Sequence, residues 1–152
     1  MVFTNINILT IAMKKWLFLF TSSLFLTELC YSQLTNNYLK NIRLSEELYK
    51  KKLYSSAASS YSKTFELNSD RGMVLDRYNA ACCYAMSLNA DSAFLQLYRI
   101  VELGHFLDYR KCLGDENFKT LQNNPKWTSL INLMKTKEED ELKNILRNSN
   151  DQ

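Results

Sequence analysis

The stretch Tyr78-Asn-Ala-Ala-Cys-Cys-Tyr-Ala-Met86 decides the fold of this chain. Only Asn79 among its nine residues is strongly polar, so the stretch has no hydrophilic face. A surface helix carries one apolar stripe, whereas a helix that is apolar on nearly every side must be packed between neighbours. The sequence therefore predicts a central helix over residues 78–86 that is sandwiched between layers of other helices.

The segments on either side of this stretch repeat its helical pattern. Ala57 and Tyr61 have the same spacing as Ala93 and Leu97, and the two alanines lie 36 residues apart. Apolar residues recur at helical spacing over residues 39–51, 54–65 and 93–101. With three glycines and one proline in 152 residues, the chain favours helices over a turn-rich β fold.

The connections between these helices have recognisable turn chemistry. Asn68-Ser-Asp-Arg-Gly72 is typical of a connecting turn, and Asn89 or Asp91 can cap the helix that follows residue 88. Gly104 follows the last periodic residues of that helix. We therefore expect Gly104 to adopt the left-handed conformation that ends many helices.

The segment after residue 114 predicts a cap on the helical stack. Asp115 can cap a short helix that buries Phe118 and Leu121. Asn124 followed by Pro125 is a strong helix start. The helix that begins there has an apolar stripe that comprises Trp127, Leu130, Ile131 and Met134. A charged run at residues 135–141 follows, which we expect to be solvated. The apolar stripe then resumes at Leu142, Ile145 and Leu146.

Residues 1–32 are built like an export signal. Lys14 and Lys15 precede an apolar run of about 12 residues, which is too short to span a bilayer. Cys30 and Ser32 place small residues before a cut ahead of Gln33, and Met13 is an alternative start of the chain. We expect a periplasmic or secreted protein, with a membrane anchor as the alternative if the segment is not cleaved.

The two helix pairs resemble tetratricopeptide repeats. The family pattern is matched by Leu44-Ser45-x-x-Leu48 with Ala57-x-x-x-Tyr61, and by Ala80-Ala81-x-x-Tyr84 with Ala93-x-x-x-Leu97. The later run Asp115-x-x-Phe118-x-x-Leu121 with Asn124-Pro125-x-Trp127 is similar to a segment that often closes such arrays. The resemblance covers roughly residues 38–134.

This resemblance implies an all-α fold, a short solenoid of antiparallel helix pairs with a C-terminal capping helix. The domain would span residues 33–134, followed by a charged helical extension and a frayed tail at 135–152. By family position Ala81 stands for the family's glycine at the closest helix approach. The residues with a structural role would be Ala57, Tyr61, Ala81, Tyr84, Ala93, Leu97, Phe118, Leu121 and Trp127.

Tetratricopeptide arrays hold peptides or partner proteins in a groove formed by the first helix of each pair. By family position the groove here would be lined by Ile42, Glu46, Tyr49, Leu75, Tyr78, Asn79, Cys82 and Met86. Cys82 stands where carboxylate-binding members of the family have a second asparagine. We therefore expect an apolar or aromatic peptide as the ligand, although Tyr78 and Met86 are equally compatible with the core.

From the sequence we expect a protein that is not an enzyme. It has no nucleophile motif, no phosphate-binding glycine loop and no metalloprotease motif, and His105 is its one histidine. The cysteines downstream of residue 33 are odd in number and lack Cys-x-x-Cys spacing, so we expect no metal and no cofactor. Buried thiols are the simplest reading of Cys82, Cys83 and Cys112, with a bridge from Cys112 as the alternative.

A net charge of +3 is too small to indicate a nucleic-acid partner. The expected function is that of an exported helical-repeat module that binds an unidentified protein or peptide. Two alternatives remain open from the sequence. One is a structural subunit that self-associates as a homo-oligomer or docks on a larger assembly, and the other is an accessory subunit of a secreted hydrolase.

Overall fold

A computed structural model describes residues 36–150 of the chain, and side chains as far as Ser149. The expected export signal at residues 1–32 lies outside this range. The chain divides into two compact units, residues 1–39 and residues 40–152. Residues 36–39, the described part of the first unit, are helical.

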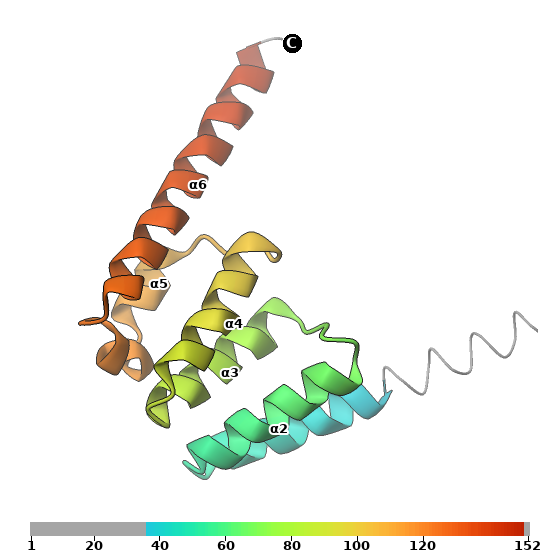
Figure 1. Ribbon diagram of the computed structural model, residues 1–152. Coiled ribbons are helices and arrows are strands. Elements are labelled where there is room, and N and C mark those ends of the chain that lie inside the picture. The colour runs from blue at the N-terminus through green and yellow to red at the C-terminus, as the bar shows by residue number, and fades with distance from the viewer. Residues whose placement is uncertain (1–35, 151–152) are drawn as a thin grey trace, which may run out of the picture. The chain divides into compact units, whose positions relative to one another are not determined.

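The second unit consists of helices joined by short turns (Figure 1). Residues 40–50 belong to a helix that covers 36–50. The later elements are α2 (Tyr54–Leu67), α3 (Val74–Met86), α4 (Ala90–Glu102), α5 (Tyr109–Gly114), the 3-10 helix η1 (Glu116–Leu121) and α6 (Pro125–Asn150). Residues 36–150 contain no strand, and the expected all-α class is confirmed.

The central helix is α3, and it has neighbours on several sides. It packs against α2, α4 and η1. Its alanines Ala80, Ala81 and Ala85 are fully buried, and so is Cys83. The sandwiched helix that the apolar stretch predicts is therefore present, and it begins four residues earlier than that stretch, at Val74.

Small residues bring α2 close to the helix that precedes it. Ser45 Oγ donates a hydrogen bond to Ser60 Oγ over 2.8 Å, and Ser45 is fully buried although it is polar. Ala57 and Ala58 on α2 are buried as well. The serine-rich run 55–60 is thus part of a helix that packs closely on its neighbour.

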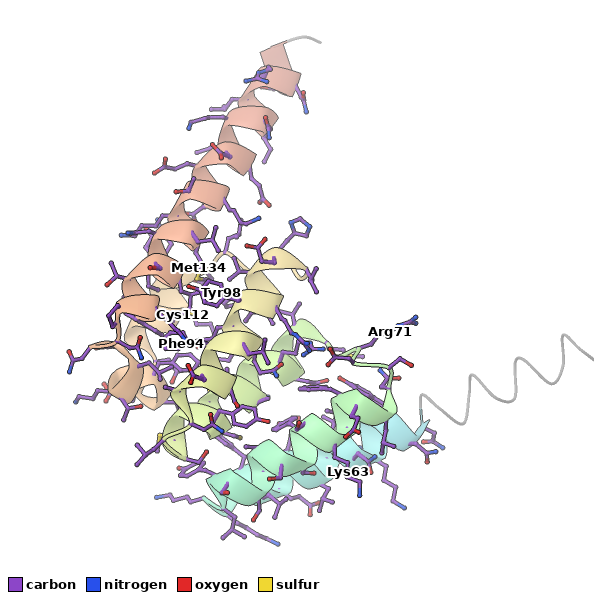
Figure 2. The ribbon with its side chains drawn as sticks, in the orientation of Figure 1. Lys63, Arg71, Phe94, Tyr98, Cys112 and Met134 are labelled. Atoms are coloured by element: carbon purple, nitrogen blue, oxygen red, sulfur yellow. The ribbon has the colours of Figure 1, made fainter. Side chains whose placement is uncertain are left out.

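The main core lies between α3, α4, α5, η1 and α6. Figure 2 shows Phe94 on α4, Cys112 on α5 and Met134 on α6, which belong to this core. The Phe118 ring centroid lies 5.3 Å from that of Tyr78 and 5.8 Å from that of Trp127. Because these rings come from three different elements, η1 links α3 to α6.

The predicted helix starts are confirmed in detail. The Asn89 side chain accepts a hydrogen bond from the Ser92 amide at the start of α4. The Asp115 carboxylate accepts one from the Asn117 amide, and the Asn124 side chain accepts one from the Lys126 amide ahead of α6. Pro125 is the first residue of α6, where its missing N–H costs nothing.

Helix ends differ from the sequence expectation. Ser69 and Leu88 have φ angles of 55° and 63° at the ends of α2 and α3. In each case the next amide bonds back to the last turn, Asp70 N to Phe65 O and Asn89 N to Tyr84 O, as in the Schellman motif. None of the glycines has a positive φ among the described residues, so the expected left-handed Gly104 is wrong, and His105 (φ 49°) takes that conformation.

The last helix extends beyond the packed body of the second unit (Figure 1). Its charged run is tied down by two ion pairs, Lys137 with Glu102 and Arg110 with Glu138. Residues 139–149 are exposed throughout, and the helix continues to Asn150. Within residues 36–150, no helix has the length and apolar character needed to cross a bilayer.

Candidate functional site

The face of α3 that was expected to line a groove is partly covered by the chain itself. Leu75, Tyr78, Asn79, Cys82 and Met86 share one face of α3 by helical spacing. Tyr78 and Cys82, in the middle of that face, are buried. They lie against the residues 115–121, which we call the closing segment.

Asp115 is the polar centre of this contact. Its carboxylate accepts a 2.7 Å hydrogen bond from the Tyr78 hydroxyl and faces the Cys82 thiol at 3.8 Å. The other carboxylate oxygen accepts hydrogen bonds from the backbone and side-chain nitrogens of Asn117. The carboxylate is thus satisfied entirely by groups of this chain, which stabilises the closing segment on α3.

The closing segment also reaches the first helix pair. The Tyr49 hydroxyl donates a hydrogen bond to Asn117 Oδ1 over 3.2 Å. Lys111 Nζ, on α5, lies 4.7 Å from the centroid of the Tyr78 ring, close enough for a cation–π contact. Tyr49 and Tyr78 are therefore brought together, and the group between them is the closing segment.

The remaining expected groove residues do not form one open surface. Asn79 hydrogen-bonds the Tyr61 hydroxyl, which places its amide in the contact between α2 and α3. Ile42 is buried and Glu46 is half-buried. Leu75, 59% exposed, and Met86, 37% exposed, lie at opposite ends of α3, so the face is open at both ends and more widely at its N-terminal end around Leu75.

Most of the expected structural residues are buried. Tyr84 is the exception, because it is half-buried at the edge of the core. The buried ones are Ala57, Tyr61, Ala81, Ala93, Leu97, Phe118, Leu121 and Trp127.

The three thiols are expected to be unreactive. Cys82, Cys83 and Cys112 are free and buried, so the alternative of a Cys112 bridge is not realised. Burial raises the pKa of Cys83 and of Cys112 to about 12, and it raises the pKa of Cys82 with a further contribution from the nearby Asp115 carboxylate. A thiol with such a pKa stays protonated near neutral pH and is a poor nucleophile and a poor metal ligand.

His105 has a carboxylate neighbour that the sequence did not reveal. Its Nδ1 lies 3.6 Å from Glu141 Oε1, and both side chains are largely exposed. Groups of three side chains suited to holding a metal ion are absent from the described part of the chain.

A polar site that the sequence analysis missed surrounds Arg77. This side chain is 8% exposed, and its guanidinium lies 4.6 Å from the centroid of the Phe65 ring. Arg77 Nη1 donates to Gln96 Oε1 over 2.6 Å, and Nη2 donates to the backbone oxygen of Asp70. The guanidinium therefore fixes the turn after α2 against both α3 and α4.

Asp70 connects this buried arginine to a second one. Arg99 Nη1 lies 2.5 Å from the Asp70 carboxylate, and Arg77 Nη2 lies 3.5 Å from it. The hydrogen bond from Arg99 is the main reason why the pKa of Asp70 lies below its usual value, and partial burial opposes the shift. Asp70 is consequently ionised at neutral pH and holds both guanidinium groups.

A surface cleft of about 350 Å³ opens beside this network. We call it the arginine cleft. Its walls come from the turn after α2, the start of α3 and the end of α4, and include Asp70, Arg71, Met73, Arg77, Arg99 and Leu103. The available sequence signal was the presence of Arg77 and Gln96 on otherwise apolar helix faces, where a charged or amide side chain needs a partner.

In comparisons with known proteins, no family model matches this chain, and neither a curated protein nor a solved structure matches it.

Proposed function

We propose that this protein is a non-catalytic interaction module of tetratricopeptide type, exported by residues 1–32, that binds a protein or peptide through the Leu75 end of α3. Support comes from the stacked helices, with α3 between α2 and α4, and from the small residues at their contacts. The buried thiols, which are expected to be unreactive, and the fully satisfied Asp115 support a binding role rather than a catalytic one.

One observation carries the proposal. The closing segment lies on the middle of the expected binding face. There Phe118 packs edge-on against Tyr78, and Asp115 accepts a hydrogen bond from the Tyr78 hydroxyl. This face therefore has the chemistry to hold a peptide segment, with aromatic side chains beside hydroxyl donors. Leu75, 59% exposed, continues the same face beyond the closing segment and is the more exposed surface left for a partner.

Site-specific photo-crosslinking tests this surface. Protein carrying a photoreactive amino acid in place of Leu75 is irradiated with the exported fraction of its own cells. A matched control carries the same group at Lys63, an exposed position on α2 that points away from the core (Figure 2). We expect a discrete crosslinked species at position 75 only. Identical products at both positions, or none at position 75, would contradict the proposal.

The export part of the proposal has its own test. N-terminal sequencing of protein recovered from the envelope or the medium should begin at Gln33. A chain that still carries Trp16 would instead indicate a tethered domain.

A second candidate function, self-association, is favoured by the end of α6. Leu142, Ile145 and Leu146 are each more than half exposed, although they continue the apolar stripe of that helix. Apolar residues that are left uncovered in this way often mark an interface. Light scattering over a range of concentrations should then show a rising mass for the natural chain and a constant one for Ile145→Lys. A constant monomer mass for both would exclude this candidate.

A further inference from the structure

The arginine cleft has an excess of positive charge. Three arginines, Arg71, Arg77 and Arg99, line it together with one carboxylate, that of Asp70. Asp70 is engaged by Arg77 and Arg99. Arg71 is exposed, makes no ion pair with any described residue, and extends from the connection between α2 and α3 (Figure 2). The cleft can therefore accept one further negative charge.

The cleft also has apolar lining residues. Met73 is 60% exposed and Leu103 is 80% exposed, and Val74 and Ile100 line the cleft with them. Water covers these large side chains in the free protein, so an apolar group that displaced the water would gain free energy. The cleft, about 350 Å³ in volume, thus combines cationic and apolar lining residues.

The floor of the cleft is fixed in advance. Arg77 is held by Gln96, Asp70 and the Phe65 ring, and Asp70 in turn orients Arg99. A Cβ at Gly72 would lie 2.6 Å from the Phe65 ring and 3.3 Å from Arg77 Nε, so this glycine permits the close approach of the turn. A site that is ordered before binding loses less entropy when its ligand arrives.

We propose that the arginine cleft binds an organic carboxylate that carries a branched apolar group, such as the C-terminal residue of a peptide or a free branched-chain acid. Arg71 and the outer edge of Arg99 contact the carboxylate, and Met73 and Leu103 enclose the apolar group. A cation is disfavoured by the guanidinium groups, and a polyanion by the Asp70 carboxylate within the cleft. This site is separate from the Leu75 face and does not depend on the proposed function.

Three probes test the proposal on the full chain by NMR titration, with the backbone amides of Gly72 and Gly104 as reporters. The probes are acetyl-Ala-Leu with a free carboxylate, the same dipeptide as the C-terminal amide, and 4-methylpentanoate. We expect saturable shifts at both glycines with the free dipeptide and at least about tenfold weaker binding of the amide, because a charged hydrogen bond is lost. Binding of 4-methylpentanoate alongside the dipeptide identifies a free acid as sufficient, and binding of the dipeptide alone identifies a peptide terminus.

Two variants assign the binding to the cleft. Arg71→Gln removes an exposed charge and should weaken the free dipeptide at least about tenfold, whereas Lys63→Gln removes an exposed charge elsewhere and should not. Leu103→Asp places a negative charge among the apolar lining residues and should abolish binding. Equal binding of acid and amide, equal binding by the natural chain and Arg71→Gln, or no shift at either glycine would overturn the proposal.

Discussion

The Tyr78 hydroxyl donates a 2.7 Å hydrogen bond to Asp115, a residue 37 positions later in the chain. Burial and the neighbouring carboxylate both raise the pKa of Tyr78, so the phenol keeps its proton over the whole physiological range. Asp115 also caps η1. One carboxylate therefore starts a helical turn and fastens that turn to the centre of α3.

Tyr78→Phe should destabilise the fold, because it leaves Oδ2 of the half-buried Asp115 carboxylate with only the long 3.8 Å contact from the Cys82 thiol. Hydrogen bonds to charged groups contribute about 1.5–3 kcal/mol, so we expect the free energy of unfolding to fall by roughly 1–3 kcal/mol. Urea unfolding followed by circular dichroism measures this loss. Tyr98→Phe is the matched control, since Tyr98 makes only an exposed 3.4 Å bond to Lys126 O, and an equal loss in both variants would contradict the role of Asp115.

Ala81→Leu should lower the melting temperature by several degrees. Ala81 is fully buried on α3, and overpacking of such a site costs about 1–3 kcal/mol. Lys63→Leu adds the same side chain at an exposed position of α2 and should change little. Similar melting temperatures for the two variants would mean that the space around Ala81 accommodates a larger side chain, which would contradict close packing there.

Leu88→Gly should stabilise the protein. Leu88 has a φ of 63° and is 80% exposed, so it bears backbone strain with little compensating packing. A left-handed conformation costs a non-glycine residue about 1–2 kcal/mol, and glycine avoids that cost. Leu103→Gly is the control, because Leu103 is equally exposed but has a right-handed φ of −105°. A gain at both positions, or at neither, would refute the strain at Leu88.

Asp70 should make stability depend on acid pH. Its pKa is lower in the folded chain than its ordinary value of 3.8, so its contribution is complete above that value and is lost as the pH falls through the folded pKa. Asp70→Asn should therefore reduce stability at pH 7 and flatten the decline of stability between about pH 5 and pH 2. Urea unfolding at several pH values measures this slope. Glu139→Gln removes an exposed carboxylate that has no ion pair among the described residues, and its slope should match that of the natural chain.

The sequence was sufficient to predict the buried central helix, because that helix carries apolar residues on nearly every side. Local capping chemistry also predicted where α4, η1 and α6 begin. It was insufficient at helix ends, where glycine was expected to supply positive φ. A Cβ on Gly104 would lie 2.5 Å from Val74 Cγ2 and 2.9 Å from Ile100 O, so this glycine serves close packing instead. Local preference cannot reveal such a contact, because its partner is 30 residues away.

The polar contacts of the candidate sites were invisible for the same reason. Arg77 and Gln96 are 19 residues apart. A pattern of apolar residues predicts that each of these polar side chains is exposed to solvent, and it does not pair them. The closing segment lies on the α3 face through the hydrogen bond between Tyr78 and Asp115, which are 37 residues apart. Sequence spacing defined which side chains share a helix face, but it did not determine which segment would lie on that face.

The hydrogen bond between Tyr49 and Asn117 joins residues 68 positions apart and bypasses the helices between them. In an array where each helix pair touches only its neighbours, unfolding can start at a free end and proceed pair by pair. Here the first pair and the closing segment are joined directly, so the first pair is not a free end. The first pair, α3 and the closing segment should accordingly lose their structure in a single concerted transition, whereas the exposed end of α6 at residues 139–149 can unfold separately.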